Sequence, residues 1–385
     1  MKVPSQFDDI RPYEPEELPE VFERLLADDQ FKSVLTSVFP NVPLAAIAAR
    51  MRACKTNTEF QMQFCYGFLK DLLSKASKGC DMDSEAVDKN RNYTFVSNHR
   101  DIVLDSALLD VMLVENGFTS TCEIAIGDNL LAAPWIKDLV RVNRSFIVKR
   151  SAVMREMLAN SKEMAEYMHF VISQKHANIW IAQREGRAKD SDDRTQESIL
   201  KMMTMGGTGS AGERLCQLNI VPVTISYEYD PCDWLKAAEF QLHRDVEGWK
   251  KSKQDDVMSM KTGILGYKGA IHYHCAPCIN NFIESLDPSV SKAELLLKVT
   301  SHIDREIHRN YRLYPGNFIA MDMLEGGNAM SGHYTAEEKE AFKAYIANQL
   351  AKITIPNKDE QFLTERMLVM YANPARNKIR EGGVL

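Results

Sequence analysis

The sequence predicts an α/β protein in which helices cover a sheet and a helical region comes first. Short apolar runs of β type alternate with longer helical patterns from Tyr93 onward, which is typical of a sheet with helical cover. The first part of the chain shows helical periodicity instead. With 385 residues, of which 45% are hydrophobic and 26% charged, the chain has ordinary globular composition and length for two or three domains.

Two segments indicate the helical N-terminal region. Residues 19–29 begin with a proline and acidic residues, which suit the first turn of a helix. Residues 57–77 carry apolar side chains at the spacing of an amphipathic helix. Residues 77–92 are polar, and we expect a linker there.

Predicted strands and helices alternate along the chain from residue 93 onward. We expect strands at residues 93–96, 146–148, 177–182, 220–227 and 270–279. We expect helices at residues 101–115, 151–174 and 291–309. Ligands of such folds gather where strands end and loops begin, so strand ends are where chemistry is expected.

Charge and composition exclude several classes of function. The formal net charge of −6 gives no indication of a nucleic-acid partner, although a local basic patch could serve an anionic ligand. The acidic, proline-containing N-terminus does not resemble a signal peptide, and apolar runs such as residues 42–49 fall short of the roughly 20 residues that span a bilayer. Eight scattered cysteines are then expected to be reduced thiols in a cytoplasmic protein.

The first chemical segment is Ser97-Asn98-His99-Arg100-Asp101, which follows an apolar strand and precedes a helix. Histidine has the intrinsic pKa of a general base, and a carboxylate can fix its tautomer. Asp105 lies about one helical turn beyond this segment, so contact with His99 is plausible. The alternative is that Asp101 is a helix N-cap and His99 a solvated turn residue.

Three further segments each combine a strand with polar residues. Residues 143–150 end in Lys149 and Arg150, and paired cations suit a phosphate, although a solvated basic face is the usual meaning of such a run. Residues 178–189 deliver Gly186 between charged residues, and glycine lets backbone approach a ligand closely; a charged surface loop is the alternative. Residues 220–231 form a buried strand with Pro222, a residue that suits a sheet edge.

These four segments, in this order, resemble the motifs of the glycerolipid acyltransferase superfamily, and most closely its soluble, chloroplast-type glycerol-3-phosphate acyltransferases. The likeness covers roughly residues 93–231. It implies an N-terminal helical bundle, expected at residues 1–88, and a mixed-sheet α/β acyltransferase domain, expected at residues 89–385. It implies His99 and Asp105 as the catalytic pair, without a metal or cofactor. The substrate-binding residues that it implies are Lys149, Arg150, Glu185, Gly186, Arg187, Lys189 and Pro222, with the four cations among them on the acceptor phosphate.

Two positions depart from the family pattern. The family places four residues between histidine and aspartate, whereas five separate His99 from Asp105, and position 104 is Leu104. One extra turn residue before the helix would restore the geometry, with Asp101 as the second choice of partner. In the third segment, Arg184 stands where many members carry glutamate, and Glu185 follows one residue later.

The resemblance implies that acyl carrier protein or coenzyme A donates an acyl thioester to the hydroxyl of glycerol-3-phosphate. Acylation of lysophosphatidate or of a hydroxyacyl amino lipid, and a non-catalytic lipid- or carrier-binding module, are the alternatives. We also expect transient contact with the inner membrane face through residues 130–155, where Trp135 lies among apolar and basic residues. Trp135 could instead dock an acidic carrier protein or belong to the core.

His272, His274, Cys275 and Cys278 form a local cluster with C-x-x-C spacing. A structural zinc site needs four well-placed ligands, and no second C-x-x-C follows. Alternation along residues 270–279 already suits a strand. We therefore interpret the cluster as part of a strand, with zinc or redox chemistry as the alternative.

Overall fold

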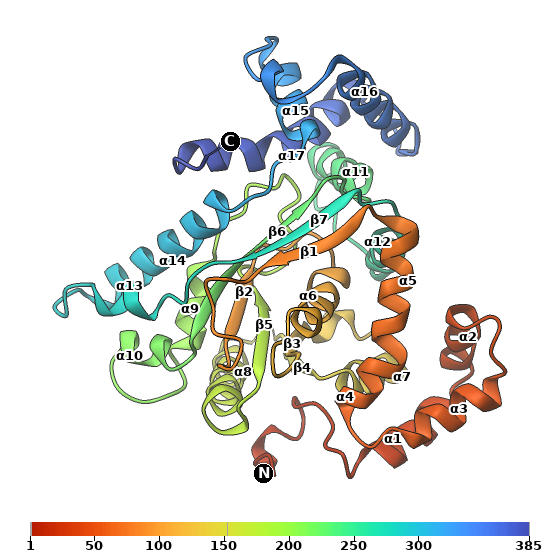
Figure 1. The fold of residues 1–385 in the computed structure, drawn as a ribbon, viewed down its shortest axis with the longest axis vertical. Helices are drawn as coiled ribbons and strands as arrows, with labels where there is room; N and C mark the ends of the chain where they lie inside the picture. The colour runs from red at the N-terminus through yellow and green to blue at the C-terminus, as the bar shows by residue number, and fades with distance from the viewer. Residues whose placement is uncertain (1, 152, 385) are drawn as a thin grey trace.

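The computed structural model describes residues 2–151 and 153–384. One sheet runs through the middle of the molecule, with helices on both of its faces, an N-terminal group of helices at one end and C-terminal helices at the other (Figure 1). The α/β class and the helical N-terminal region predicted from the sequence are confirmed.

The sheet has seven strands within the described residues: β1 (Gly79–Asp83), β2 (Thr94–Ser97), β3 (Cys122–Gly127), β4 (Ser145–Val148), β5 (Asn178–Ala182), β6 (Ile220–Tyr227) and β7 (Ala270–Cys275). Their order is β1-β7-β6-β2-β5-β3-β4. Neighbours are parallel except β6 and β7, so the sheet is mixed, as predicted. The carboxyl ends of β2 to β6 therefore meet along one edge, which we call the carboxyl edge.

Residues 79–83 were predicted to lie in a linker, and this prediction was wrong. They form β1, which pairs with β7 from Gly79–Ala270 to Asp83–His274. β1 is an edge strand and none of its residues is fully buried, so it has no apolar run by which a sequence pattern could identify it. The domain division at residue 88 stays a prediction. β1 lies within the first 88 residues and is nevertheless part of the sheet.

Strand side chains alternate between two cores. Phe95, Val221 and Tyr273 pack on one face against α5 (Gly67–Ala76) and α6 (Leu104–Glu115). Val96 and Ile220 pack on the other face. The helices of that face are α8 (Met154–Phe170), α9 (Glu197–Met203), α10 (Ala211–Cys216), α13 (Asn280–Glu284) and α14 (Lys292–Arg309). Continuous burial explains why β2, β5 and β6 read as apolar runs.

The N-terminal helices share a core of their own with α7 (Pro134–Val142). They are α1 (Leu18–Ala27), α2 (Asp29–Val38), α3 (Leu44–Ala53) and α4 (Asn57–Phe60). α4 continues through a π-helical segment, Gln61–Tyr66, into α5, so the predicted helix at residues 57–77 is one helical run. α8 likewise ends in a π-helical segment, Val171–Lys175.

Five further helices of the described residues follow β6, and none of them was predicted from the sequence. Its helices are α11 (Asp233–Asp245), α12 (Lys253–Leu265), α15 (Pro315–Glu325), α16 (Ala336–Ala351) and α17 (Glu360–Arg380). α11, α15, α16 and α17 share one core, and α12 packs beside α5 (Figure 1). Three 3-10 segments complete the description: Ser5–Phe7, Asp128–Leu130 and Ser331–His333.

Candidate active site

The turn between β2 and α6 carries His99 at the carboxyl edge. Asn98, just before it, is fully buried, and its side chain makes two hydrogen bonds to the backbone of β6. Its Oδ1 atom accepts from the Ile225 N–H at 2.7 Å, and its Nδ2 atom donates to the Ile225 carbonyl at 3.0 Å. This two-bond contact fixes the end of β2 against the neighbouring strand. The turn that carries His99 therefore starts from a strand end whose position is fixed.

His99 and Asp105 meet in the structure. The distance from His99 Nδ1 to Asp105 Oδ2 is 2.8 Å, and the exposed fractions of the two side chains are 13% and 1%. A carboxylate on Nδ1 favours the tautomer that carries the proton there and leaves Nε2 as an acceptor. The imidazole edge also faces Trp180 of β5, with ring centroids 5.7 Å apart. The pair has the arrangement of a general base with an orienting carboxylate.

The extra residue between histidine and aspartate is taken up by the turn. α6 begins at Leu104, so Asp105 lies in its first turn and faces back toward His99. The same Oδ2 atom accepts from the backbone N–H groups of Arg100, at 2.6 Å, and of Asp101, at 3.0 Å. Asp105 thus holds the turn and the imidazole together.

Asp101, the second choice of partner, makes other contacts. Its Oδ1 atom accepts from the backbone N–H groups of Val103 and Leu104, at 2.9 and 2.8 Å, and so caps the start of α6. Burial raises the pKa of this carboxyl, and the neighbouring Asp105 carboxylate raises it further. The backbone of α12 at Gly263 packs closely against the other oxygen, Oδ2: a Cβ atom built on Gly263 would lie 1.9 Å from it. The contacts of Asp101 are those of a helix cap, the alternative weighed from the sequence.

The cations of the second and third segments are held by carboxylates of several elements. Lys149 lies 3.1 Å from Glu163 of α8 and 3.6 Å from Asp9, and Lys189 donates to Glu239 of α11. Arg150 and Glu185 form an ion pair of 2.7 Å, which joins the two segments beside the carboxyl edge. These internal partners would compete with a phosphate for each of the three cations.

Arg187 differs from the other three cations. Its Nη1 atom is buried and has no hydrogen-bond partner among the described residues. Burial lowers the pKa of the guanidinium, but the thiol of Cys232 and the carboxylates of Asp101 and Asp230 outweigh this and raise it. Gly186, just before it, has φ of +68°, a conformation that glycine adopts at little cost and that lets the chain turn there. A buried, unpaired donor is the kind of group that an anion would satisfy.

Pro222 was expected to suit a sheet edge, and this was wrong because β6 lies inside the sheet. Pro222 pairs with Val96 of β2, while the β6–β7 register begins only at Val223. The missing N–H therefore lies outside that ladder, which explains how an interior strand tolerates the ring. Ile225, three residues further on, is the β6 residue that meets Asn98 at the carboxyl edge.

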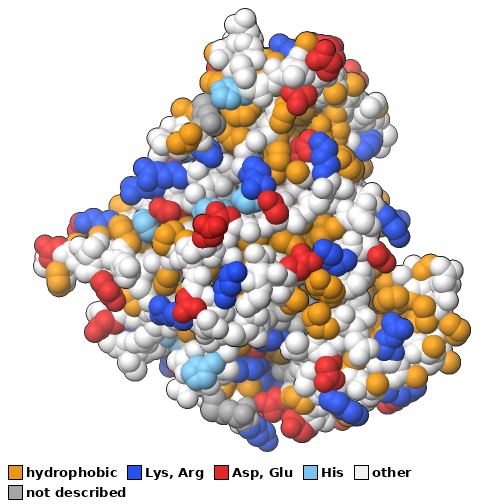
Figure 2. Space-filling view, viewed as in Figure 1, with side chains coloured by type: hydrophobic (Ala, Val, Ile, Leu, Met, Phe, Trp, Pro, Cys, Tyr) orange, Lys and Arg blue, Asp and Glu red, His pale blue; other side chains and the backbone are white. Residues whose placement is uncertain are grey.

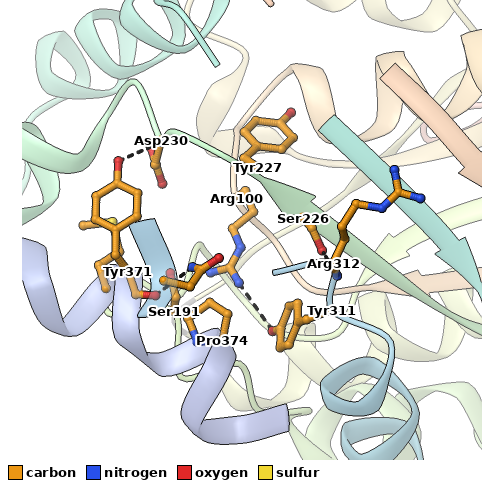
Figure 3. A pocket seen from close by; sticks show the side chains of 11 residues that line it. Arg100, Ser191, Ser226, Tyr227, Asp230, Tyr311, Arg312, Tyr371 and Pro374 are labelled. Atoms are coloured by element: carbon orange, nitrogen blue, oxygen red, sulfur yellow. Dashed lines mark hydrogen bonds between the residues drawn. The ribbon is translucent and has the colours of Figure 1, made fainter. Parts of the chain in front are cut away.

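A buried polar network lies behind His99, and no sequence pattern indicated it. Arg100 Nη2 lies 2.7 Å from Asp193 Oδ2 and 3.4 Å from the Tyr311 hydroxyl. The Arg100 carbonyl accepts from Lys236 Nζ at 3.1 Å, and Lys236 also pairs with Asp230. Figure 3 shows Arg100 beside Tyr311, at a cavity of about 30 Å³ that Tyr371 of α17 lines on the other side. No local spacing predicts the contacts of Arg100, because they join residues that are 93 to 211 positions apart.

Trp135, the centre of the expected membrane surface, packs against α2. Its ring centroid is 5.9 Å from that of Phe31, and its Nε1 donates to Gln30 at 3.0 Å. Nearby Arg141 is buried and donates to backbone carbonyls of the N-terminal segment. Trp135 is thus half-buried against the core of the N-terminal helices, and the expected membrane contact stays a prediction.

Residues 81–226 match the family model described as Acyltransferase. The matched residues contain the first three of the four segments singled out in the sequence, the start of the fourth at residues 220–226, and the His99–Asp105 pair, and the match supports the resemblance to the glycerolipid acyltransferase superfamily. A search of curated proteins found no match. Among solved structures, the 1-acyl-sn-glycerophosphate (LPA) acyltransferase PlsC from Thermotoga maritima is similar at 14% identity and a TM-score of 0.38, over 76% of this chain and 94% of that chain.

Two further observations concern membranes and metals. No helix in the described part of the chain combines the length and hydropathy that crossing a membrane requires. Within residues 2–151 and 153–384, no three His, Cys, Asp or Glu side chains are grouped so as to hold a metal ion. His272, His274 and Cys275 lie in β7, so the strand interpretation is confirmed for these three residues, while Cys278 lies after the end of the strand.

Proposed function

We propose that this protein transfers an acyl chain from the thioester of acyl carrier protein or coenzyme A to the hydroxyl of glycerol-3-phosphate. The observation that carries the proposal is the hydrogen bond between His99 and the buried Asp105 at the carboxyl edge of a sheet whose sequence matches an acyltransferase family. The family match supports acyl transfer, and the choice of acceptor rests on the resemblance of the four segments.

In the proposed reaction, His99 Nε2 takes the proton of the acceptor hydroxyl while Asp105 stabilises the imidazolium that forms. The oxygen attacks the thioester carbonyl and a tetrahedral intermediate forms. Collapse of this intermediate breaks the carbon–sulfur bond, and the thiolate leaves with the proton from His99. The ester and the free thiol are the products.

Arg187 is the residue that we propose to hold the acceptor phosphate. Its buried, unpaired Nη1 atom supplies a donor that needs an acceptor, and a guanidinium binds phosphate oxygens well. Holding the phosphate keeps the hydroxyl near the carbonyl and so lowers the entropic part of the barrier. Arg150 contributes if the incoming phosphate displaces Glu185 from the ion pair between them.

The direct test is to incubate the protein with labelled acyl thioester and a panel of acceptors that includes glycerol-3-phosphate and lysophosphatidate. We expect His99→Ala to fold normally, as judged by circular dichroism, and to lose at least about 10²-fold in turnover, the contribution of a general base. Turnover close to that of the wild type in the folded variant would contradict the proposal. Faster transfer to lysophosphatidate would keep the reaction and change the acceptor.

A further inference from the structure

β1 and β7 form two histidine–aspartate pairs, two residues apart along the strands. The register pairs Asp81 with His272 and Asp83 with His274. The Nδ1 atoms of the two rings lie 2.9 and 3.1 Å from the carboxylates. Since side chains two residues apart share a face of a strand, both pairs lie on one side of the sheet. Each carboxylate orients its ring by Nδ1, so the Nε2 atoms point away from β1.

An open cavity of about 470 Å³ lies beside these rings, lined also by segments from the C-terminal third. Six of its lining residues are basic, and no described lining residue is acidic. The six are His272, His274, Arg309, Arg312, His333 and Lys378. They include three of the nine histidines of the whole chain. Figure 2 shows pale-blue histidines next to blue lysine and arginine side chains on the face where β1 and β7 lie in Figure 1.

The charges of this cavity are only partly compensated. Arg312 Nη1 donates to both oxygens of Asp81, at 2.9 and 2.7 Å, and its guanidinium points away from Arg100 (Figure 3). Lys378 Nζ donates to the Tyr311 carbonyl at 2.7 Å and has no carboxylate partner among the described residues. Burial lowers the pKa of Lys378, so a bound anion would relieve the cost of keeping its charge.

The cavity lies on the opposite face of the sheet from the His99–Asp105 pair, although Tyr311 and Arg312 line both this cavity and the small cavity beside Arg100. Tyr273, between the two histidines, points to the other face of the sheet, where its hydroxyl donates to the Asp105 carbonyl at 2.9 Å. On the histidine face, Thr224, the register partner of His274, donates to the Ile307 carbonyl of α14. The sheet therefore stands between the catalytic pair and the cavity.

We propose that this cavity binds a phosphate-bearing anion, held by Arg312, Lys378 and the Nε2 atoms of His272 and His274. An ammonium and a guanidinium around one opening supply donors that phosphate oxygens accept. The two rings, whose Nδ1 atoms face Asp81 and Asp83, add Nε2–H donors as imidazolium ions, the form that a bound anion favours. The phosphate belongs either to a small diffusible compound or to a lipid headgroup that the open cavity admits. This site does not depend on the proposed acyl transfer.

The test uses the full chain and inorganic pyrophosphate in isothermal titration calorimetry. Since pyrophosphate can also occupy the acceptor site at Arg187, we expect one binding event to disappear in Arg187→Gln and a different one to weaken in Lys378→Gln. The second effect should be at least about tenfold in Kd, as expected for the loss of one charge-assisted hydrogen bond. Binding is measured without thioester, so its outcome is independent of catalysis.

Arg376→Gln is the matched control, since it removes one positive charge from the same helix, where Arg376 pairs with Glu325 outside the cavity. It should leave Kd unchanged. His274→Gln, whose side chain is 21% exposed, should reproduce the loss if Lys378→Gln does not fold. Sedimentation with phosphatidate vesicles, against phosphatidylcholine alone, identifies a headgroup as the source. Equal effects of Lys378→Gln and Arg376→Gln, or no binding of either probe, would overturn the proposal.

Discussion

At the scale of single residues, one atom of Asp105 organises the candidate active site. Its Oδ2 oxygen accepts from the imidazole of His99 and from two backbone N–H groups of the turn. The carboxylate is fully buried, so its position is set by these three donors and not by solvent. Orientation of the base and closure of the turn therefore depend on the same group.

Substituting each of the two aspartates in turn should separate an effect on catalysis from an effect on stability. Asp105→Asn should lower turnover by a factor on the order of 10² to 10⁴, because the imidazole loses its charged partner and its fixed tautomer. Asp101→Ala should retain most turnover and lower the free energy of unfolding by about 1 kcal/mol, the usual value of a helix cap. Steady-state kinetics and urea unfolding measure the two effects. The opposite pattern would transfer the partner role to Asp101.

Arg187 and Lys149 should differ in their effect on the acceptor, although the resemblance gives both the same role. Arg187→Gln should raise the KM for the acceptor about 10- to 100-fold and leave the KM for the thioester unchanged, since it removes the Nη1 donor, which has no hydrogen-bond partner among the described residues. Lys149→Gln should change either KM little, because Glu163 already holds that ammonium. Comparable increases in both variants would show that the phosphate displaces Glu163.

At the scale of elements, α12 is the helix that presses on the start of α6. The contact is close because position 263 is glycine, which lets the helix backbone approach the Asp101 carboxylate. Helix propensity alone would disfavour glycine inside α12. The packing against Asp101 accounts for its presence there.

Gly263→Ala should lower the free energy of unfolding by about 1 to 3 kcal/mol, the range for inserting an atom into a packed site. Gly67→Ala is the matched control: it lies in the helical run of α4 and α5, and a Cβ atom there would meet nothing within 4 Å. That substitution should stabilise the protein by up to about 1 kcal/mol. Chemical unfolding of both variants tests the contrast, and similar destabilisation by the two would refute the close contact.

Elements with a continuous apolar run or a long helical period could be predicted from sequence, and short or polar elements could not. The buried strands β2, β5 and β6 and the long helix α14 lie within one or two residues of their predicted bounds. β1 and β3 were missed, because β1 is a polar edge strand and the apolar part of β3 is only a few residues long. A short segment carries too little pattern to separate strand from loop.

At the scale of the whole molecule, the same limit applies to the site. His99 and Asp105 are six positions apart, so helix geometry could predict their contact. Lys189–Glu239 and Lys236–Arg100 join distant segments, and only the packing of α11 beside the sheet edge brings them together. Sequence patterns could therefore identify the reacting group, while the partners that neutralise the cations and brace the turn come from tertiary structure.

Lys236 and Tyr311 contact the His99 turn from segments that are synthesised later. Both residues lie beyond the matched segment 81–226, yet one holds the Arg100 carbonyl and the other its guanidinium. During synthesis, the ribosome releases β2 and α6 long before α11 and the residues after α14. Until those arrive, Arg100 and Asp193 pair only with each other, and the network behind the turn lacks the contacts from Lys236 and Tyr311. The turn itself closes locally, because Asp105 accepts from the backbone N–H groups of Arg100 and Asp101, and the later segments then brace it from behind.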